Sequence, residues 1–178
     1  MKSFIESKYA KEIIDFKCPR YEDFPDIGLY MEQLIEILNQ NLAIFASHPN
    51  EKLITSTMVN NYVKQKIIVP PKNKKYSRHQ LIYLFVVGIL KQVLSISDIA
   101  ELIKWELEMY PIDVAYNFFC VEFEKGLNAA FVTRDFSEPS SASKDTDISE
   151  LFRSQLLAVS NKIYVTKYMQ YRRENLNE

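Results

Sequence analysis

Eight basic residues stand together in a stretch of the chain that has no acidic residue. The stretch runs from Lys52 to Ser97, and its basic residues are Lys52, Lys64, Lys66, Lys72, Lys74, Lys75, Arg78 and Lys91. The whole chain has a net charge of −1, so these eight positive charges leave −9 for the rest. Ordinary solvated surfaces mix the two signs. The segregated positive block therefore predicts a face that meets a polyanion.

Within this block, residues 56–66 have the spacing of a short amphipathic helix. Met58, Val59, Tyr62 and Val63 share one side, and the other side is polar and free of carboxylates. Asparagine and glutamine can pair with an adenine edge through two hydrogen bonds, and lysine can contact guanine or phosphate. We predict that this side reads the bases of double-stranded DNA through Asn60, Asn61, Lys64 and Gln65. The alternative is a solvated helix surface with no partner.

A lysine-rich turn follows this helix. Pro70-Pro71 stops the helix, because proline lacks an amide donor and restricts the residue before it. Ser77 and Gln80 have the spacing of a capping box, which predicts a new helix reaching about Val93. Long side chains on or beside such a turn can reach the DNA backbone, so we expect phosphate contacts from Lys66, Lys72, Lys74, Lys75 and Arg78.

The remaining segments predict a mostly α fold. Only three glycines occur, which disfavours all-β and nucleotide-binding α/β folds. Hydrophobic periodicity and capping residues predict helices over residues 3–16, 26–45 with Asp26 as the N-cap, 55–65, 77–93, 95–107, 111–131 and from 148 onward. Residues 136–147 are polar and predict a loop.

The order of residues from Leu53 to Ile103 resembles the MerR-type winged helix-turn-helix. Tyr62, Pro70-Pro71, Lys74-Lys75, Tyr76-Ser77 and Leu94–Ile103 fall in the order of that family's motifs. The resemblance implies a phosphate contact for Tyr62. The chain departs from the pattern where the family has an arginine, a first tyrosine and a turn glycine, because Asn60, Asn61 and Lys66 stand there. The wing over residues 70–76 is short, so we expect a reduced wing.

Over most of the chain the closer resemblance is to a bacterial family, domain of unknown function 1836. It is carried by Pro25-Asp26-Ile27, Leu29-Tyr30-Met31, Asn60–Lys64, Lys74–Arg78 and Leu90–Ser97. The resemblance implies a MerR-like, reduced-wing helix-turn-helix core with additional C-terminal helices, and regulation of transcription by analogy of fold. We therefore expect a DNA-binding-like domain over residues 1–110, with its core at 53–107, and a helical dimerisation or effector region over 111–178.

The second half of the chain is rich in aromatic residues, and their role is open between two readings. They could line a pocket for a small apolar effector, or they could form the core or a dimer interface. The residues concerned are Trp105, Tyr110, Tyr116, Phe118, Phe119, Phe123 and Phe131. The final helix carries more apolar positions than a small domain needs, so we expect it to make the chain a homodimer.

No pattern in the sequence points to catalysis, to a cofactor or to a metal. His48 and His79 have no partners at metal-ligand spacing, and neither a glycine-rich phosphate loop nor a known hydrolase motif occurs. Cys18 and Cys120 form no redox-like pair, which suggests a reducing compartment. The longest apolar run, Leu81–Leu90, is about half of what spans a bilayer, and the first residues do not resemble a signal peptide. We expect a cytoplasmic protein that is not an enzyme.

Two hypotheses follow from these patterns. The first is a homodimeric, sequence-specific regulator that binds double-stranded DNA. The second is a protein-interaction or small-ligand-sensing module that keeps the helix-turn-helix scaffold without binding DNA, which the short wing and the missing arginine favour.

Overall fold

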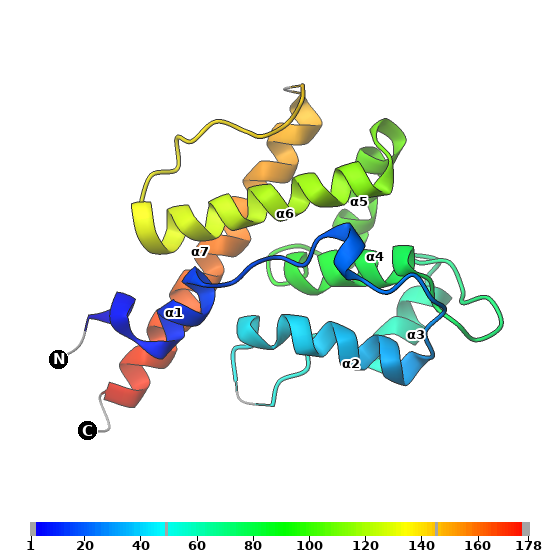
Figure 1. Ribbon diagram of the computed structural model, residues 1–178, viewed down its shortest axis with the longest axis horizontal. Helices are drawn as coiled ribbons and strands as arrows, with labels where there is room; N and C mark the ends of the chain where they lie inside the picture. The colour runs from blue at the N-terminus through cyan, green and yellow to red at the C-terminus, as the bar shows by residue number, and fades with distance from the viewer. Residues whose placement is uncertain (1–2, 49, 145, 176–178) are drawn as a thin grey trace. The chain divides into compact units, whose positions relative to one another are not determined.

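The computed structural model describes residues 3–48, 50–144 and 146–175, and these residues fold into helices joined by short connections (Figure 1). The α-helices are α1 (Lys8–Ile14), α2 (Met31–Leu42), α3 (Ser56–Lys64), α4 (Arg78–Leu90), α5 (Ile96–Met109), α6 (Ile112–Asn128) and α7 (Asp147–Asn175). Short turns of 3-10 helix cover Phe4–Glu6, Tyr21–Asp23 and Ala43–Phe45, and a π-helical turn, Ala129–Thr133, follows α6. In the described ranges there is no β-strand, only two isolated bridges. The prediction of a mostly α fold is confirmed.

The chain divides into two compact units. One is Pro19–Tyr116, and the other combines the N-terminal residues up to Cys18 with the residues from Asn117 onward. This division differs from the predicted one, which placed residues 1–110 together. The difference arises because the N-terminal residues pack on α7. Helix α1 contacts α7, and the ring of Phe4, in the 3-10 turn before α1, contacts those of Tyr164, Tyr168 and Tyr171. Helix periodicity shows that a segment has an apolar side and does not show which distant helix covers it.

Helix α4 is the centre of the Pro19–Tyr116 unit. Its residues from Gln80 to Leu90 are buried except for the half-buried Tyr83. A helix that is apolar all round must be covered on all sides. The Phe85 ring, in the middle of α4, contacts the rings of Phe24 and Tyr116. The predicted capping box is present, since Ser77 Oγ accepts from the Gln80 amide and Gln80 Oε1 accepts from the Ser77 amide at 2.8 Å.

The first helix of this unit begins later than the sequence predicts. Helix α2 starts at Met31 with Tyr30 as its N-cap, so the prediction that Asp26 is the N-cap is wrong. Leu29 instead pairs with Tyr76 through two backbone hydrogen bonds of 2.9 and 2.8 Å. A residue that exchanges both backbone bonds with a distant partner is extended and cannot lie in a helix.

In the other unit, α6 packs on α7 through aromatic rings and one buried charge cluster. Phe118 and Phe119 contact Phe152 of α7. The buried carboxylate of Glu122 lies 3.4 Å from the Arg153 guanidinium and accepts from the Ser141 amide at 2.7 Å. That last bond holds the predicted polar loop, which has no helix or strand from 136 to 144; residue 145 lies outside the described residues. No helix in the described ranges is both long and apolar enough to cross a membrane.

Helix α4 approaches α2 closely at Gly88. A Cβ atom added there would lie 2.6 Å from Leu42 Cδ1 and 3.4 Å from Ile54 Cγ1. Both neighbours are fully buried, so neither can move into solvent. Helix packing in the Pro19–Tyr116 unit therefore requires a residue without a side chain at this position.

We expect the effect of Gly88→Ala on the free energy of unfolding to change sign when the side chain of Leu42 is shortened. In the native chain it should lower the free energy of unfolding by about 1 kcal/mol, because overpacking outweighs the gain in helix propensity. Leu42→Ala should itself cost about 2–5 kcal/mol and leave space. In that background Gly88→Ala should raise the free energy of unfolding by about 1 kcal/mol. Denaturant titration of the four proteins measures this, and an effect of the same sign in both backgrounds would contradict the close approach.

Candidate nucleic-acid interface

Helix α3 presents the predicted polar side to solvent. Its N-terminus is capped by Thr55, whose side-chain oxygen accepts from the Met58 amide at 3.3 Å. Val59 and Tyr62 are buried and fix the rotation of the helix. On the opposite side, all five polar residues predicted there are exposed, namely Thr57, Asn60, Asn61, Lys64 and Gln65. Within the part of the chain that the structure describes, neither the Asn60 nor the Asn61 side chain makes a hydrogen bond, so both amides are available to a ligand.

Helix α3 ends in a Schellman motif with lysine in the left-handed position. The Ile67 amide donates to the Tyr62 carbonyl at 2.9 Å, and the Lys66 amide donates to the Val63 carbonyl at 3.0 Å. Lys66 has φ 58°, the conformation for which glycine is usually chosen. The sequence comparison placed Lys66 at the turn glycine of the MerR-type pattern, and its left-handed conformation is one that glycine adopts readily.

The segment predicted to be a reduced wing contains a two-residue hairpin. Lys72 and Lys75 exchange two backbone hydrogen bonds of 3.1 and 3.0 Å. The residues between them, Asn73 and Lys74, have φ 51° and 62°, so both are left-handed, as a type I′ turn requires. Three lysines within four residues are thereby held at the tip of a tight turn. In Figure 1 this turn projects from the same end of the Pro19–Tyr116 unit that carries α3.

The base of the hairpin is fixed by buried groups. Gln80 is 8% exposed, and its Nε2 donates to the Val69 carbonyl at 2.9 Å. Tyr76, on the other side of the base, is buried and pairs with Leu29. The stem of Lys75 lies against Gly28, where an added Cβ would be 3.0 Å from the lysine Cβ, and its ammonium lies 5.2 Å from the centre of the Tyr30 ring.

Two of the predicted phosphate contacts have other partners in the structure. The Arg78 side chain is 13% exposed and lies 3.2 Å from a Glu22 carboxylate oxygen and 3.9 Å from one of Asp26. Its guanidinium also stacks on the ring of Tyr21, at 4.9 Å. Tyr62 is 7% exposed and packs in the core, and burial raises the pKa of its phenol. Neither side chain therefore extends freely from the surface: Arg78 is held by its carboxylate neighbours, and Tyr62 is buried under α3.

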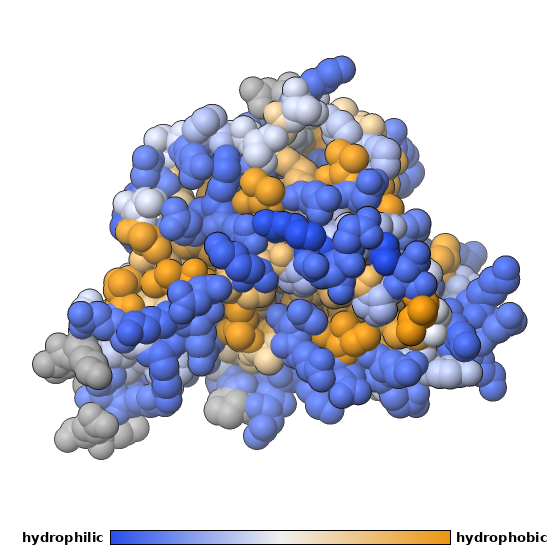
Figure 2. Space-filling model, in the orientation of Figure 1, coloured by the Kyte–Doolittle hydropathy of each residue, from blue (hydrophilic) through white to orange (hydrophobic). Residues whose placement is uncertain are grey.

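The other cations of the predicted site are exposed and uncompensated. Lys64, Lys66, Lys72, Lys74 and Lys75 are all exposed, and no ion pair reaches any of them from the residues that the structure describes. Hydrophilic side chains cover the edge where the hairpin projects (Figure 2). Lys91, which belongs to the same basic stretch, is half-buried near Met58 Sδ at 3.5 Å, and this burial lowers the pKa of its ammonium.

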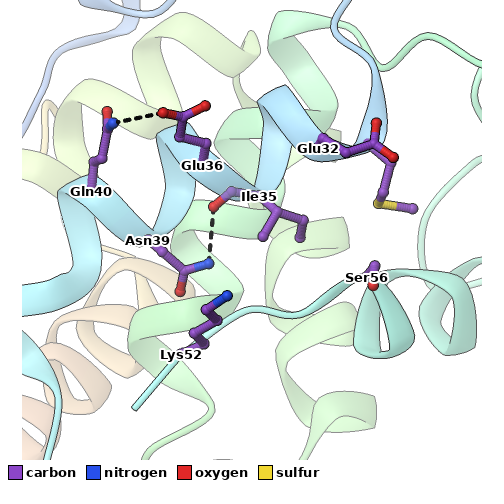
Figure 3. A pocket seen from close by; sticks show the side chains of 8 residues that line it. Glu32, Ile35, Glu36, Asn39, Gln40, Lys52 and Ser56 are labelled. Atoms are coloured by element: carbon purple, nitrogen blue, oxygen red, sulfur yellow. Dashed lines mark hydrogen bonds between the residues drawn. The ribbon is translucent and has the colours of Figure 1, made fainter. Parts of the chain in front are cut away.

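The segment that enters α3 is tied to α2 by a residue that sequence reasoning missed. Asn39 Nδ2 donates to the carbonyl of Ile35 on its own helix at 2.9 Å and to the carbonyl of Ile54 at 2.8 Å. Asn39 also lies in a groove of about 580 Å³ beside α2, whose other lining residues include Glu32, Glu36 and Lys52 (Figure 3). An asparagine inside an amphipathic helix gives no sequence signal of this role, because its partner carbonyl lies on a distant segment.

Comparison with known families assigns the part of the chain that carries this surface. The model for "Domain of unknown function (DUF1836)" matches residues 19–119, more than half of the chain. The chain belongs to this family. The DUF1836 match coincides with the compact unit Pro19–Tyr116 to within three residues at its C-terminal end. The predicted resemblance to this family is thereby confirmed. No curated protein and no solved structure matched the chain.

The DUF1836 unit therefore holds every residue of the predicted interface, with α3 and the hairpin as its two parts. Sequence reasoning found α3, its cap, its polar side and the lysines of the turn. It missed Asn39, Gly28 and the left-handed pair, although Asn73 is a residue type that tolerates a left-handed turn. In the described ranges no three or more His, Cys, Asp or Glu residues are grouped so that they could hold a metal ion.

The left-handed conformation of Lys66 predicts a stabilising substitution. Lys66→Gly should raise the free energy of unfolding by about 1 kcal/mol, because glycine has no Cβ to strain this conformation. The matched control is Lys64→Gly, which removes the same side chain from within α3 and should lower it by about 0.5–1 kcal/mol. Denaturant titration distinguishes the two. Equal losses of stability in both variants would show that Lys66 is not left-handed in solution.

Proposed function

We propose that this chain is a sequence-specific regulator of transcription that binds double-stranded DNA through a MerR-like helix-turn-helix core with a reduced wing. One observation carries the proposal: an exposed, carboxylate-free helix side with unbonded amides adjoins a tight turn whose lysines form no ion pair with the described residues. Cations without a partner are costly to gather unless a polyanion binds them. The proposed site of action is the cytoplasm, and the activity requires neither catalysis nor a cofactor.

The dimensions of α3 suit the major groove. An α-helix with its side chains is about 10–12 Å across, close to the roughly 12 Å width of the groove, and the nine residues of α3 extend about 13.5 Å along it. With the buried side of α3 held by Val59 and Tyr62, the side chains of Asn60, Asn61, Lys64 and Gln65 would face base edges. The left-handed turn at Lys66 and the hairpin would then contact phosphates through Lys66, Lys72, Lys74 and Lys75.

Arg78 and Tyr62 have a positioning role in this proposal. Arg78 joins the first turn of α4 to the segment around Glu22 and Asp26, and so holds the base of the hairpin against the rest of the unit. A guanidinium with two carboxylate neighbours has little charge left for phosphate. Tyr62 is buried on the core side of α3 and so holds this helix against the rest of the unit.

The second candidate is a protein-interaction or small-ligand-sensing module on the same scaffold. Glu22 and Asp26 favour it, because their side chains are 81% and 82% exposed next to the Arg78 guanidinium and would repel phosphate. A pocket for a small effector among the aromatic residues of the second half has less support. Four of these residues are buried against other rings, namely Tyr116, Phe119, Phe123 and Phe131. DNA titration separates the two candidates: the second predicts weak binding with no preference among duplexes.

The salt dependence of binding tests the role of the hairpin lysines. A DNA fragment enriched from a genomic pool serves as the ligand, and fluorescence anisotropy gives its affinity at several salt concentrations. Each phosphate contact contributes about −0.9 to the slope of log affinity against log salt. The double substitution Lys72→Gln with Lys74→Asn should make the slope about 1.8 less steep. Asparagine is chosen at position 74 because it tolerates the left-handed backbone.

The matched control for this experiment is Lys11→Gln with Lys104→Gln. Both lysines are exposed and lie outside the proposed interface, on α1 and α5, and the change in net charge is the same. This control should leave the slope unchanged. A slope that falls equally in both double variants would mean that binding follows net charge alone, and the assigned face would be wrong.

The amides of α3 should determine sequence preference. Asn60→Ala with Asn61→Ala should reduce the preference for the enriched fragment over random duplex by at least about 30-fold, because each of the two bidentate contacts discriminates by about 1–3 kcal/mol. The salt slope should stay the same, since no cation is removed. Competition anisotropy with random duplex measures the preference, and Asn128→Ala on α6 is the control. An unchanged preference would remove α3 from base reading.

A further inference from the structure

Helix α7 carries an exposed apolar side that nothing in the described chain covers. Leu151, Val165 and Met169 are 40%, 59% and 46% exposed, and Ala158 is exposed between them. At 3.6 residues per turn these four positions lie along one line of the helix, and the exposed Ser154 and the half-buried Lys162 lie between them on the same side. The opposite line is buried and holds Phe152, Leu156, Val159, Ile163 and Tyr171. Helix α7 (Figure 1) lies outside residues 19–119, so the family match says nothing about this side.

The two ends of this apolar line have opposite charges. Asp147 and Glu150 lie in the first turn of α7, and Arg172 and Arg173 lie in its last turn. Asp147 and Arg172 fall on the same line as the apolar residues, one at each end. A surface with one acidic end and one basic end is complementary to itself when it is turned end for end.

We propose that the occupant of this side is a second copy of the chain, with the two α7 helices packed antiparallel about a two-fold axis at the level of residues 159 and 160. In this register Asp147 lies opposite the partner copy's last turn at Arg172, Leu151 lies opposite Met169, and Ser154 lies opposite Val165. The two-fold axis repeats every contact, as an isologous interface requires. The apolar line from Leu151 to Met169 is about 27 Å long at 1.5 Å per residue.

Charge fixes the direction of this pairing. In an antiparallel pair each acidic first turn meets a basic last turn, and the helix dipoles are opposed. A parallel pair would place Asp147 beside Asp147 and Arg172 beside Arg172, which is unfavourable at both ends. A partner of different sequence would need the same charge order by coincidence, whereas a second copy provides it by symmetry.

The first test is the mass of the full chain in solution without DNA. Sedimentation velocity over a micromolar concentration series should show a dimer. Val165→Glu, at the most exposed apolar position of the line, should raise the dissociation constant at least about 10-fold, because it buries a carboxylate in the interface. Val114→Glu places the same change at an exposed valine of α6 and should leave the dimer intact. A monomeric native chain, or a dimer that survives Val165→Glu, would overturn the proposal.

Cysteine cross-linking tests the direction of the helices. Ser154→Cys and Val165→Cys are prepared as separate proteins, oxidised alone and as an equal mixture. Antiparallel packing predicts a cross-linked dimer only in the mixture, since two copies of residue 154 would lie about 16 Å apart along the axis. Cross-links in each protein alone and none in the mixture would overturn the antiparallel register. The native Cys18 and Cys120 are buried. Because neither test contains DNA, its failure is separate from a failure of the proposed function.

Discussion

The buried side-chain amide of Gln80 hydrogen-bonds to backbone groups on both sides of the basic hairpin. Its oxygen accepts from the Ser77 amide at the start of α4, and its nitrogen donates to the Val69 carbonyl before the hairpin. Without this side chain, two backbone groups at the base would lose their partners, at about 1–3 kcal/mol for each one left buried. A turn of only a few residues has no core of its own. The direction in which its lysines point is therefore set by this one side chain and by the pairing of Tyr76 with Leu29.

Three residues in the two tight turns of the proposed interface have left-handed backbone. Lys66, Asn73 and Lys74 all have positive φ, and the two lysines carry a strain of about 1–2 kcal/mol each that glycine would avoid. Strained backbone persists where the surrounding structure over-determines it, and it concentrates at functional sites. Here the Schellman bonds fix Lys66 and the hairpin bonds fix Lys74. The strain is consistent with a benefit from cations at the tips of tight turns, which is what phosphate binding would supply.

The basic stretch separates in space into cations with partners and cations without. Arg78 pairs with Glu22, which lies 56 residues earlier in the chain, and Lys91 is half-buried beside Met58. The hairpin lysines have no such partner within the described residues. A count of charges along the sequence cannot make this distinction, because a carboxylate from a distant segment can neutralise one cation and leave its neighbour free. The useful quantity for binding a polyanion is the uncompensated charge on the folded surface.

Local chemistry in the sequence determined the elements of this protein. Thr55 and Ser77 cap the predicted helices because a side-chain oxygen needs only the next few amides, and the polar side of α3 follows from helical periodicity. Tertiary structure decided the rest. Asp26 does not cap α2 because Leu29 pairs with Tyr76. The N-terminal residues belong with α7 because the Phe4 ring meets the Tyr164 ring, which is distant in sequence. Backbone pairing and burial between distant segments leave no pattern in the local sequence. In the folded chain these contacts override the local preferences for helix and capping.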